Sequence, residues 1–517
     1  MVERTVETKK ELFTIEPWDE HNQKTVANVH PNDWVNPEPS GRYNLIVLGA
    51  GTAGLVSAIG AAGLGAKVAL IEKELMGGDC LNVGCVPSKA LIRAARAAAD
   101  VRAAADFGVN VPDGVAVDFP KVMERMRRLR AEISNNDSAQ RFTDEGVDVF
   151  IGKGTFTGRN RIEVNDRTLR FSKAVIATGA RAVALPIPGL KEAGYLTNET
   201  VFSLTELPKR LIVIGAGPIG CELAQAFARF GSDVHLLEAV DQILIREDKD
   251  AAERVEQALV RDGVKIITGC KINTVSKHGV DKVVELECAG ECLQLAVDDI
   301  LVSVGRSPNV GGIGLEAAGV EFDPRKGVVV DDTLQTSNRN IFAAGDCCFH
   351  YKFTHTADAL ARIVIQNALF GFPFMKKKAS ALTIPWCTFT DPEIGHVGMY
   401  EKDAKAKGIP VRTFVAELGD VDRAILDGED DGFIKVHVKE GTDRILGATL
   451  VARHAGEMLS ELTLAITAGV GLGTVADTIH PYPTQAECIK RAADAFNRTR
   501  LTPRVKGLFE KWLAWNR

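Results

Sequence analysis

The hydrophobic pattern of this chain contains one unit twice. An apolar run over residues 45–48 leads into Gly49-Ala-Gly51-Thr-Ala-Gly54, and a second run over residues 211–214 leads into Gly215-Ala-Gly217-Pro-Ile-Gly220. Short continuous apolar runs are typical of buried strands in a parallel sheet, and glycines at this spacing permit a tight turn that opens a helix. The pattern predicts two strand–turn–helix units that bind dinucleotides.

Each unit is followed by an acidic residue where a second apolar run ends. Glu72 follows residues 68–71 and Glu238 follows residues 234–237, and both lie 23 positions after the first glycine of their unit. At the carboxyl end of the second strand, a carboxylate can accept hydrogen bonds from a ribose. Because this spacing occurs twice, it favours nucleotide binding over a glycine-rich turn that binds nothing.

The first unit also has a membrane alternative. Residues 45–66 carry no charge over 22 positions, which is about the length of a bilayer-spanning helix. The glycines at 49, 51 and 54 instead fit a strand, a tight turn and a helix start, so we expect a Rossmann unit here rather than a membrane span.

The pattern changes toward both ends of the chain. Residues 1–41 are polar and contain four prolines, so we expect an extended arm whose Trp18 and Trp34 pack on the body. Residues 115–142 form a charged helical stretch, which we interpret as a solvated face rather than a phosphate site. From about residue 382 the pattern predicts strands and then a helix over residues 456–468, which indicates a separate α+β domain.

Composition narrows the function classes. The net charge of -6 argues against a nucleic-acid-binding surface, which would need a basic surplus. The ten cysteines are irregularly spaced and the first residues lack the apolar core of a signal peptide. We therefore expect a cytoplasmic protein in a reducing compartment, with no nucleic-acid partner.

One cysteine pair stands apart from the others. Residues 77–89 read Gly-Gly-Asp-Cys-Leu-Asn-Val-Gly-Cys-Val-Pro-Ser-Lys and place Cys80 and Cys85 at the opening of a helix, whose positive dipole end favours a thiolate. We interpret the pair as a redox dithiol rather than as buried cysteines or part of a zinc site, which would need a second close pair. Cys288 and Cys292 are the spaced alternative, and their surroundings predict a hairpin tip.

With these motifs in this order, the chain resembles the flavin-dependent pyridine nucleotide-disulfide oxidoreductases over residues 42 to about 497. That family includes lipoamide dehydrogenase, glutathione reductase and mercuric reductase. The motifs that complete the resemblance are Ala177-Thr178-Gly179, Gly305-Arg306-x-Pro308-Asn309 and Ile341-Phe-Ala-Ala-Gly345-Asp346.

The resemblance implies an α/β fold with two Rossmann-type dinucleotide-binding domains, for FAD and NAD, and a C-terminal α+β dimerisation domain. The implied segments are an N-terminal extension (1–41), an FAD-binding domain in two parts (42–188 and 311–381), an NAD(P)-binding domain (189–310), the dimerisation domain (382–497) and a basic amphipathic helix (498–517).

It also implies where FAD would be held. Glu72 would bind the adenosine ribose, the helix start after Gly51 would hold the pyrophosphate, and Asp346 would accept a hydrogen bond from the ribityl chain. Lys89 would lie beside the flavin ring, with Glu222 as its ion-pair partner. The other cofactor-binding residues that the resemblance implies are Gly49, Gly54, Gly154, Thr178, Gly179, Gly215, Gly217, Gly220 and Gly305.

The implied electron path runs from the nicotinamide through FAD to the dithiol, where Cys85 would take electrons and Cys80 would meet the acceptor. Glu238 would accept a hydrogen bond from a free 2′-hydroxyl and repel a 2′-phosphate, and residues 239–243 contain no arginine. We therefore expect NADH as the donor. Arg246 lies eight residues after Glu238 and leaves NADPH open.

The C-terminal motif departs from the disulfide-reducing members of the family. Those carry His-Pro-Thr-x-x-Glu, whose histidine protonates the leaving thiolate, whereas this chain has Tyr482-Pro-Thr-Gln-Ala-Glu487. Mercuric reductase also has tyrosine at that point. The resemblance implies a homodimer in which Tyr482 and Glu487 of one subunit approach the partner's Cys80. His480 is the alternative base, and Asp79, in place of the family's threonine, is either a proton acceptor or a helix N-cap.

The leading hypothesis is a mercuric reductase-like enzyme that reduces Hg(II) or another thiophilic acceptor. The Cys-x-x-Cys domain and the C-terminal cysteine pair of mercuric reductase have no counterpart before residue 42 or after Cys488, which weakens it. The alternatives are a dihydrolipoamide dehydrogenase-type enzyme and, from another class, a non-catalytic flavin redox sensor or membrane-associated flavoprotein. We interpret the adjacent Cys347 and Cys348 as structural.

The last twenty residues have a composition of their own. Residues 498–517 contain six Lys or Arg against one Glu, and their apolar residues fall largely on one helical face. This pattern suits peripheral contact with an anionic membrane. From the sequence alone, we favour packing on the protein's own body or its dimer mate over that contact.

Overall fold

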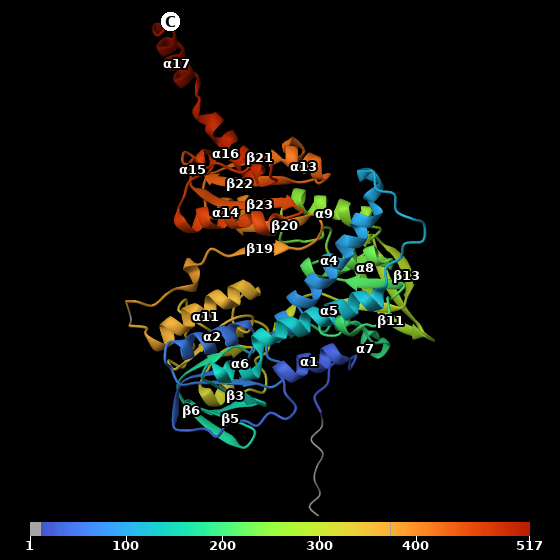
Figure 1. The fold of residues 1–517 in the computed structure, drawn as a ribbon, viewed down its shortest axis with the longest axis vertical. Coiled ribbons are helices and arrows are strands. Elements are labelled where there is room, and N and C mark those ends of the chain that lie inside the picture. The colour runs from blue at the N-terminus through green and yellow to red at the C-terminus, as the bar shows by residue number, and fades with distance from the viewer. Residues whose placement is uncertain (1–11, 373) are drawn as a thin grey trace, which may run out of the picture.

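The computed structural model describes residues 12–372 and 374–517 (Figure 1). The first Rossmann unit is a parallel sheet in the order β3-β2-β1-β6, with β18 beside β6. Helix α2 (Thr52–Gly63) packs against α11 (Thr354–Leu369), so the two parts of this domain meet although they are far apart in sequence. The strands are β1 (Arg42–Leu48), β2 (Val68–Glu72), β3 (Val147–Ile151), β6 (Arg167–Ile176) and β18 (Ile341–Ala343), with an antiparallel extension of β4 (Gly154–Gly158) and β5 (Arg161–Val164).

The second Rossmann unit is a four-stranded parallel sheet in the order β10-β9-β8-β14. Its strands are β8 (Arg210–Ile214), β9 (Asp233–Leu237), β10 (Lys265–Ile267) and β14 (Asp299–Val302), and its helices are α8 (Pro218–Phe230) and α9 (Lys249–Arg261). An antiparallel sheet of β11 (Cys270–His278), β12 (Asp281–Cys288) and β13 (Glu291–Val297) lies beside it. Cys288 pairs with Glu291 across the β12–β13 turn, so the predicted hairpin tip is confirmed.

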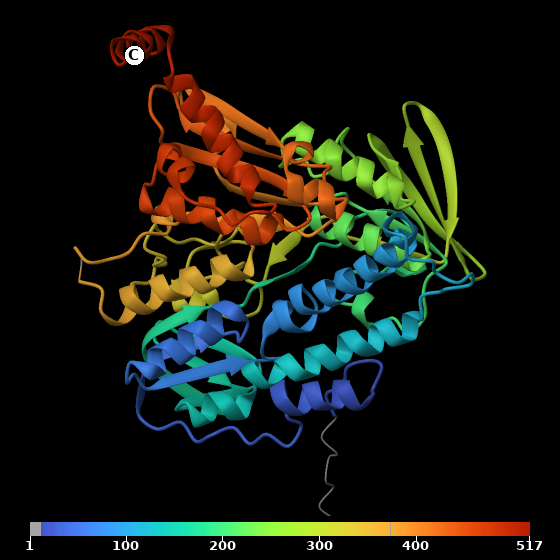
Figure 2. The same cartoon turned by 45° about the horizontal axis from the view of Figure 1, so that its top comes forward.

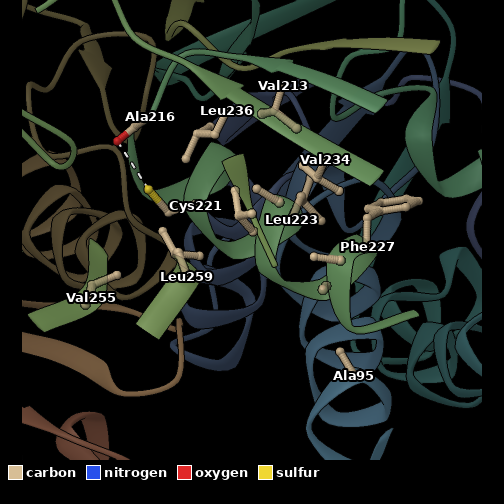
Figure 3. Close-up of a cluster of buried hydrophobic side chains, with 14 of the residues drawn as sticks. Ala95, Val213, Ala216, Cys221, Leu223, Phe227, Val234, Leu236, Val255 and Leu259 are labelled. Atoms are coloured by element: carbon tan, nitrogen blue, oxygen red, sulfur yellow. Dashed lines mark hydrogen bonds between the residues drawn. The ribbon is translucent and has the colours of Figure 1, made fainter. Parts of the chain in front are cut away.

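The core of the second unit extends into the first. Leu223 and Phe227 of α8 pack against Val213 and Leu236 of the sheet, and Ala95 reaches the same cluster from α4 (Cys85–Arg102) (Figure 3). Helix α4 therefore belongs to both domains: it begins at the predicted dithiol and its other turns pack on the second Rossmann unit.

The C-terminal domain is an antiparallel sheet in the order β19-β20-β23-β22-β21, covered by helices, which gives the α+β fold that the sequence predicted (Figure 2). Its strands are β19 (Pro385–Thr388), β20 (Glu393–Gly398), β21 (Val411–Glu417), β22 (Phe433–Lys439) and β23 (Ile445–Ala452). Its helices are α12 (Glu401–Ala406), α13 (Asp422–Asp427), α14 (Ala455–Ala468), α15 (Leu472–Asp477) and α16 (Glu487–Arg500). A last helix, α17 (Pro503–Trp515), projects away from it (Figures 1 and 2).

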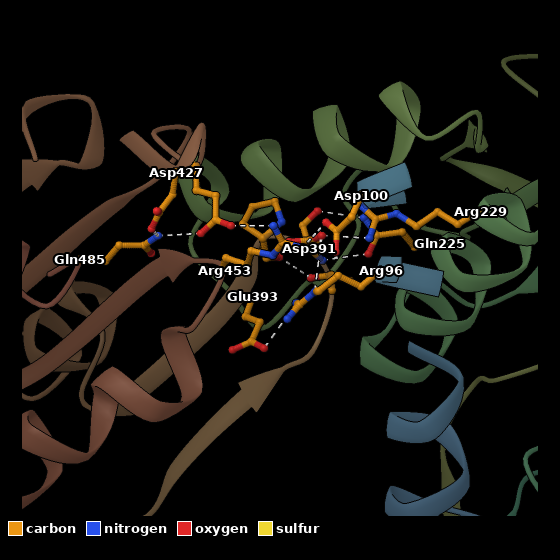
Figure 4. A network of polar contacts seen from close by, with 12 residues as sticks. Arg96, Asp100, Gln225, Arg229, Asp391, Glu393, Asp427, Arg453 and Gln485 are labelled. Atoms are coloured by element: carbon orange, nitrogen blue, oxygen red, sulfur yellow. Dashed lines mark hydrogen bonds and ion pairs between the residues drawn. The ribbon is translucent and has the colours of Figure 1, made fainter. Parts of the chain in front are cut away.

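A polar network around Asp391 joins helix α4, the second Rossmann unit and the C-terminal domain. Asp391, in the loop after β19, lies 2.9 Å from Arg229 of α8 and 3.6 Å from Arg96 of α4, and Arg453 approaches it from the C-terminal domain (Figure 4). Burial raises the pKa of Asp391, but the arginines outweigh it and hold that pKa below its usual value. The carboxylate therefore stays charged and connects the domains.

Two expectations about the N-terminal third are wrong. The extension is not an extended arm over its whole length, because residues Glu20–Val29 form helix α1, which packs against α5 (Phe119–Ile133). Helix α5 is not simply a solvated face either, since Arg127 and Arg130 are buried and bind Asp19 and Asn22. Local charge density could not reveal these partners, which lie 108 positions away in the sequence. Trp34 does pack on the body, with its indole N–H donating to the Val149 carbonyl at 3.1 Å, whereas Trp18 is exposed.

Residues 45–66 form the predicted strand, turn and helix start. Among the described residues, no helix has the length and apolarity that crossing a bilayer would require. The other short elements are α3 (Gly78–Asn82), α6 (Ala139–Asp144), α7 (Leu190–Ala193), α10 (Leu315–Ala318), β7 (Ala180–Ala182), β15 (Arg306–Pro308), β16 (Phe322–Asp323) and β17 (Gly327–Val328).

Candidate active site

The two predicted redox cysteines lie on consecutive helices rather than on one. Cys80 is in the five-residue α3, and Cys85 is the first residue of the 18-residue α4. Val83 and Gly84 separate the two helices, and a side chain at Gly84 would lie 2.7 Å from the Asp79 carbonyl oxygen, so the tight connection requires glycine. Cys80 is half-buried and Cys85 is exposed, which leaves Cys85 on a face that a ligand can cover.

The electrostatics distinguish the two sulfurs. The Cys80 thiol donates a hydrogen bond to Cys85, which stabilises the Cys85 thiolate, whereas burial disfavours it. The Thr354 hydroxyl at 3.3 Å and the Lys89 ammonium stabilise the thiolate further. Together these interactions lower the pKa of Cys85 to about 6. The same hydrogen bond, together with burial, raises the pKa of Cys80. At neutral pH, Cys85 is therefore the thiolate and Cys80 the thiol, as expected of a cysteine at a helix N-terminus.

Lys89 forms the ion pair that the resemblance implied. Its Nζ lies 2.8 Å from Glu222 Oε2 and 4.5 Å from the centre of the Phe389 ring. The other oxygen of Glu222 accepts the Phe389 backbone N–H at 2.9 Å. Burial lowers the pKa of Lys89, but Glu222 outweighs it and the pKa is raised. Lys89 is thus a fixed cation one helical turn from Cys85.

Both Rossmann carboxylates turn back onto their glycine loops. Glu72 accepts the Ala50 N–H at 2.6 Å, and Glu238 accepts the Ala216 N–H at 2.8 Å. The two sites therefore have the same local geometry, as the repeated spacing predicted. Each carboxylate lies at a strand end beside a helix start, where a dinucleotide ribose and pyrophosphate are bound in this fold.

The glycine loops leave room for that ligand. A side chain on Gly49 would collide with the Ala177 carbonyl, whereas the open side of Gly217 has no atom within 4 Å and that of Gly51 meets only Gly78, at 3.7 Å. The residues present fit FAD in the first unit and a nicotinamide dinucleotide in the second. Gly154 differs, because a side chain there would lie 2.5 Å from a Leu48 methyl carbon, so the structure places it in the core and its cofactor contact stays a prediction.

The other predicted cofactor residues surround these loops. Thr178 donates its hydroxyl to the Asn309 carbonyl at 2.7 Å, which holds the segment of Gly179 against the segment that follows Gly305. Asp346 lies beside Arg306 with 3.4 Å between Oδ2 and Nε. Gly54 and Gly220 lie against the turns of Gly49 and Gly215, where a side chain would strike the turn carbonyls.

Arg306 has a contact that the sequence did not predict. Its guanidinium pairs with Asp79, the residue before Cys80, while its Nε faces Asp346. Asp79 is therefore not an N-cap, since the N-cap of α3 is Gly77. Arg306 belonged to a recognised motif, but no local signal connected it to Asp79. Thr354, at the start of α11, was missed for the same reason.

The C-terminal motif residues do not reach the dithiol of their own chain. Tyr482 is exposed and its hydroxyl donates to Asp422 at 2.8 Å, which raises the pKa of Tyr482. Glu487 pairs with Arg491 at 2.9 Å. The side chain of His480 is only 6% exposed and lies 3.1 Å from Glu461, which holds the imidazole in a nearly buried position. Cys347 is buried and its thiol donates to the Ile176 and Ala344 carbonyls, in agreement with a structural role.

Comparison with family models identifies the fold and its chemistry together. Residues 43–361 match the model described as pyridine nucleotide-disulphide oxidoreductase, and residues 384–493 match that family's dimerisation domain. The chain belongs to the pyridine nucleotide-disulphide oxidoreductases. It is accordingly an FAD-containing enzyme that uses NAD(P)H, and the predicted fold class and cofactors are confirmed.

Its relatives divide between two activities. The chain is 35% identical to a mercuric reductase of Bacillus cereus over 90% of this chain and 73% of that protein. It is 36% identical to a dihydrolipoyl dehydrogenase of Bacillus subtilis over 87% and 95%. Among solved structures, the HOCl-induced flavoprotein disulfide reductase RclA of Escherichia coli, as a Cu(II) complex, aligns with a TM-score of 0.78 and 29% identity, covering 88% of this chain and all of that one. Overall similarity does not select the acceptor.

Proposed function

We propose that this enzyme transfers electrons from NADH through the Cys80–Cys85 pair to Hg(II) or another thiophilic acceptor, and that it acts as a homodimer. The observation that carries the proposal is the environment of the C-terminal motif. Tyr482 stands where disulfide-reducing members have a histidine, and His480, two residues earlier, is bound to Glu461 and has a nearly buried side chain. A disulfide acceptor needs an acid to protonate its leaving thiolate, and a phenol with a raised pKa supplies that proton poorly.

A thiophilic metal ion has no such requirement. Thiolate sulfur is a soft ligand that binds such ions directly, and Cys85 is already deprotonated at neutral pH because of its lowered pKa. Tyr482 is exposed and would offer its hydroxyl as a ligand or hydrogen-bond donor at the mouth of the site. The relatives include mercuric reductases and a Cu(II) complex of a disulfide reductase, but also dihydrolipoyl dehydrogenases, so their names are compatible with this class without selecting it.

Other residues of the chain would bind the flavin and orient the dithiol. Glu72, Gly51 and Asp346 would bind FAD, which when bound supplies a two-electron carrier between the nicotinamide and the dithiol. Lys89, fixed by Glu222, would hold a positive charge at the flavin ring and beside the Cys85 thiolate. Arg306 would orient the Cys80 helix through Asp79.

The donor is assigned from the second Rossmann unit. Glu238 places a carboxylate where the 2′-position of the ribose would lie, and Asp241 adds a second negative charge in the same loop. A 2′-phosphate would be repelled there, and residues 239–245 offer no arginine to neutralise it. NADH is therefore the proposed donor.

The dimer follows from the matched dimerisation domain. Tyr482 is exposed on this domain, Glu487 is partly buried beside Arg491, and neither reaches the dithiol of its own chain, so the proposed site is completed when they approach the partner's Cys80. Sedimentation of the purified protein tests the stoichiometry.

An acceptor panel tests the function. NADH oxidation is measured with Hg(II), Cu(II), lipoamide and glutathione disulfide, for the wild type and for Cys80→Ser. The proposal expects turnover with the metal ions, little with the disulfides, and loss of metal-dependent turnover in Cys80→Ser. Efficient lipoamide turnover favours the dihydrolipoamide dehydrogenase alternative, and absence of turnover with every acceptor favours the redox sensor.

A further inference from the structure

Helix α17 leaves its apolar side chains uncovered. None of its residues is buried, and both views show it extending away from the C-terminal domain (Figures 1 and 2). Leu508, Phe509, Trp512, Leu513 and Trp515 are each more than half exposed. The helix is well formed, with Thr502 accepting the Val505 N–H at its start and proline in its first turn. It also lies beyond residue 493, where the match to the dimerisation domain ends.

The positions of the charges identify the kind of surface that would cover it. At 3.6 residues per turn, Val505, Leu508, Phe509, Trp512, Leu513 and Trp515 share one face. Arg504 and Lys511 border this face on one side, and Lys506 borders it on the other, while Arg517 follows the end of the helix. The single acid, Glu510, falls on the opposite face with Gly507 and Ala514. Apolar aromatic residues between two basic edges are typical of helices that lie in the interface of an anionic membrane.

We propose that α17 binds the surface of an anionic lipid bilayer and attaches the enzyme peripherally to it. Its 13 residues span about 20 Å at 1.5 Å per residue, less than the hydrocarbon core, so the helix would lie in the plane of the surface. Trp512 and Trp515, whose ring centres are 5.5 Å apart, would sit at the headgroup level, where indole rings are favoured. The basic edges would meet lipid phosphates.

A second copy of the helix is a poorer partner than the bilayer. Symmetric pairing of two such faces would bring basic edges against each other, because both borders of the face are positive and Glu510 lies on the far side. The body of the protein does not supply the missing negative surface in this structure, since the side chains of α17 stay exposed. The rest of the chain carries a net negative charge, so the electrostatic attraction of the protein to anionic lipid would be confined to this helix.

Vesicle flotation of the full-length holoenzyme tests the proposal with two matched variants. Trp512→Glu places a carboxylate in the apolar face, and Ala514→Glu places the same charge on the opposite face. We expect the wild type to float with mixed phosphatidylcholine–phosphatidylserine vesicles. With vesicles of phosphatidylcholine alone, it should stay in the bottom fraction. Trp512→Glu should lower the partition coefficient by at least about 10-fold, and Ala514→Glu by less than about 5-fold.

Each other outcome contradicts the proposal. Absence of flotation with the anionic vesicles, or equal partitioning of the two variants, overturns it. If Trp512→Glu changes the oligomeric mass in sedimentation while flotation is unaltered, the occupant is a second copy. NADH oxidation with ferricyanide, which should be the same for all three proteins, verifies that each variant is folded and carries its cofactor.

Discussion

Lys89 and Glu222 join the dithiol helix to the second Rossmann unit across 2.8 Å. Lys89 lies one turn after Cys85 on α4, and Glu222 lies on α8, two residues after the last glycine of the second motif. The pair therefore connects the helix of the reactive sulfur to the nucleotide-binding domain through a salt bridge. The Phe389 backbone N–H donates to the other oxygen of Glu222 and so fixes the position of this carboxylate.

Replacing Glu222 by Gln should leave Lys89 without its counter-ion. We expect a decrease of about 2 kcal/mol in the free energy of unfolding, which is typical of a lost hydrogen bond to a charged group. The raised pKa of Lys89 should fall, since only Cys85 and Cys387 then oppose the effect of burial. Denaturant unfolding measures the first effect. Glu253→Gln is the matched control, because its pair with Lys249 is exposed on α9 and should contribute less than about 1 kcal/mol. Equal losses in both variants would contradict the special role of the Lys89 pair.

The pKa of Cys85 predicts a pH profile for alkylation. The thiolate form reacts, so the rate of Cys85 modification by iodoacetamide should rise with pH through about 6 and level off above it. Cys80→Ala removes the thiol that donates to Cys85, so the inflection should move to higher pH. Mass spectrometry of the modified peptide locates the label. Faster labelling of Cys80 than of Cys85 in the reduced wild type would reverse the assignment of thiolate and thiol.

The same division of roles predicts a spectroscopic difference. If the Cys85 thiolate lies against the flavin, two-electron reduction of the holoenzyme should give a long-wavelength charge-transfer absorption. Cys85→Ser should abolish it, whereas Cys80→Ser should retain it and lose acceptor reduction. Identical spectra and activities for the two variants would show that the sulfurs are equivalent.

Donor selectivity can be tested at Glu238. Glu238→Ala with Val240→Arg removes a repulsive carboxylate and adds a partner for a 2′-phosphate. We expect the ratio of kcat/KM for NADPH to that for NADH to rise by at least about 10-fold. Glu238→Ala alone should lower kcat/KM for NADH, and it should raise kcat/KM for NADPH less than the double substitution does. An unchanged ratio would show that the ribose lies elsewhere.

The parts of the site that follow local rules could be predicted from sequence, and the parts that depend on distant partners could not. The glycine turns, Glu72, Glu238 and the cysteine pair each follow from spacing within about 25 residues, because strand, turn and helix are consecutive. Asp79 and Arg306 are 227 positions apart, so nothing near Asp79 indicates that it is an ion-pair partner. His480 looked available as a base in the sequence, but it is sequestered by Glu461 on α14, 19 positions earlier. The burial of Arg127 and Arg130 was missed for the same reason.

Asp391 predicts how stability depends on pH. Its pKa is lower in the folded protein than the usual 3.8, so its contribution is complete above that value and is lost as the pH falls through the lowered pKa. Asp391→Asn should cost about 3 kcal/mol at neutral pH, because Arg96, Arg229 and Arg453 then lack their shared anion. The difference between wild type and variant should shrink below about pH 4. Denaturant midpoints across this range measure it, and a difference that does not change with pH would mean that charge is not the cause.

Tyr482 provides the sharpest test of the acceptor. Tyr482→Phe removes the exposed hydroxyl and should impair metal-dependent NADH oxidation, while Tyr482→His restores an acid with a pKa near neutrality at the position where disulfide-reducing relatives carry one. General acid catalysis contributes about 100-fold or more, so Tyr482→His should raise lipoamide turnover by a measurable part of that factor. His480→Ala should change turnover with neither acceptor, since the His480 side chain is bound to Glu461 and nearly buried. Efficient lipoamide reduction by the wild type that is lost in His480→Ala and unchanged in Tyr482→Phe would transfer the role of base to His480 and reverse the proposed preference for a metal ion over a disulfide.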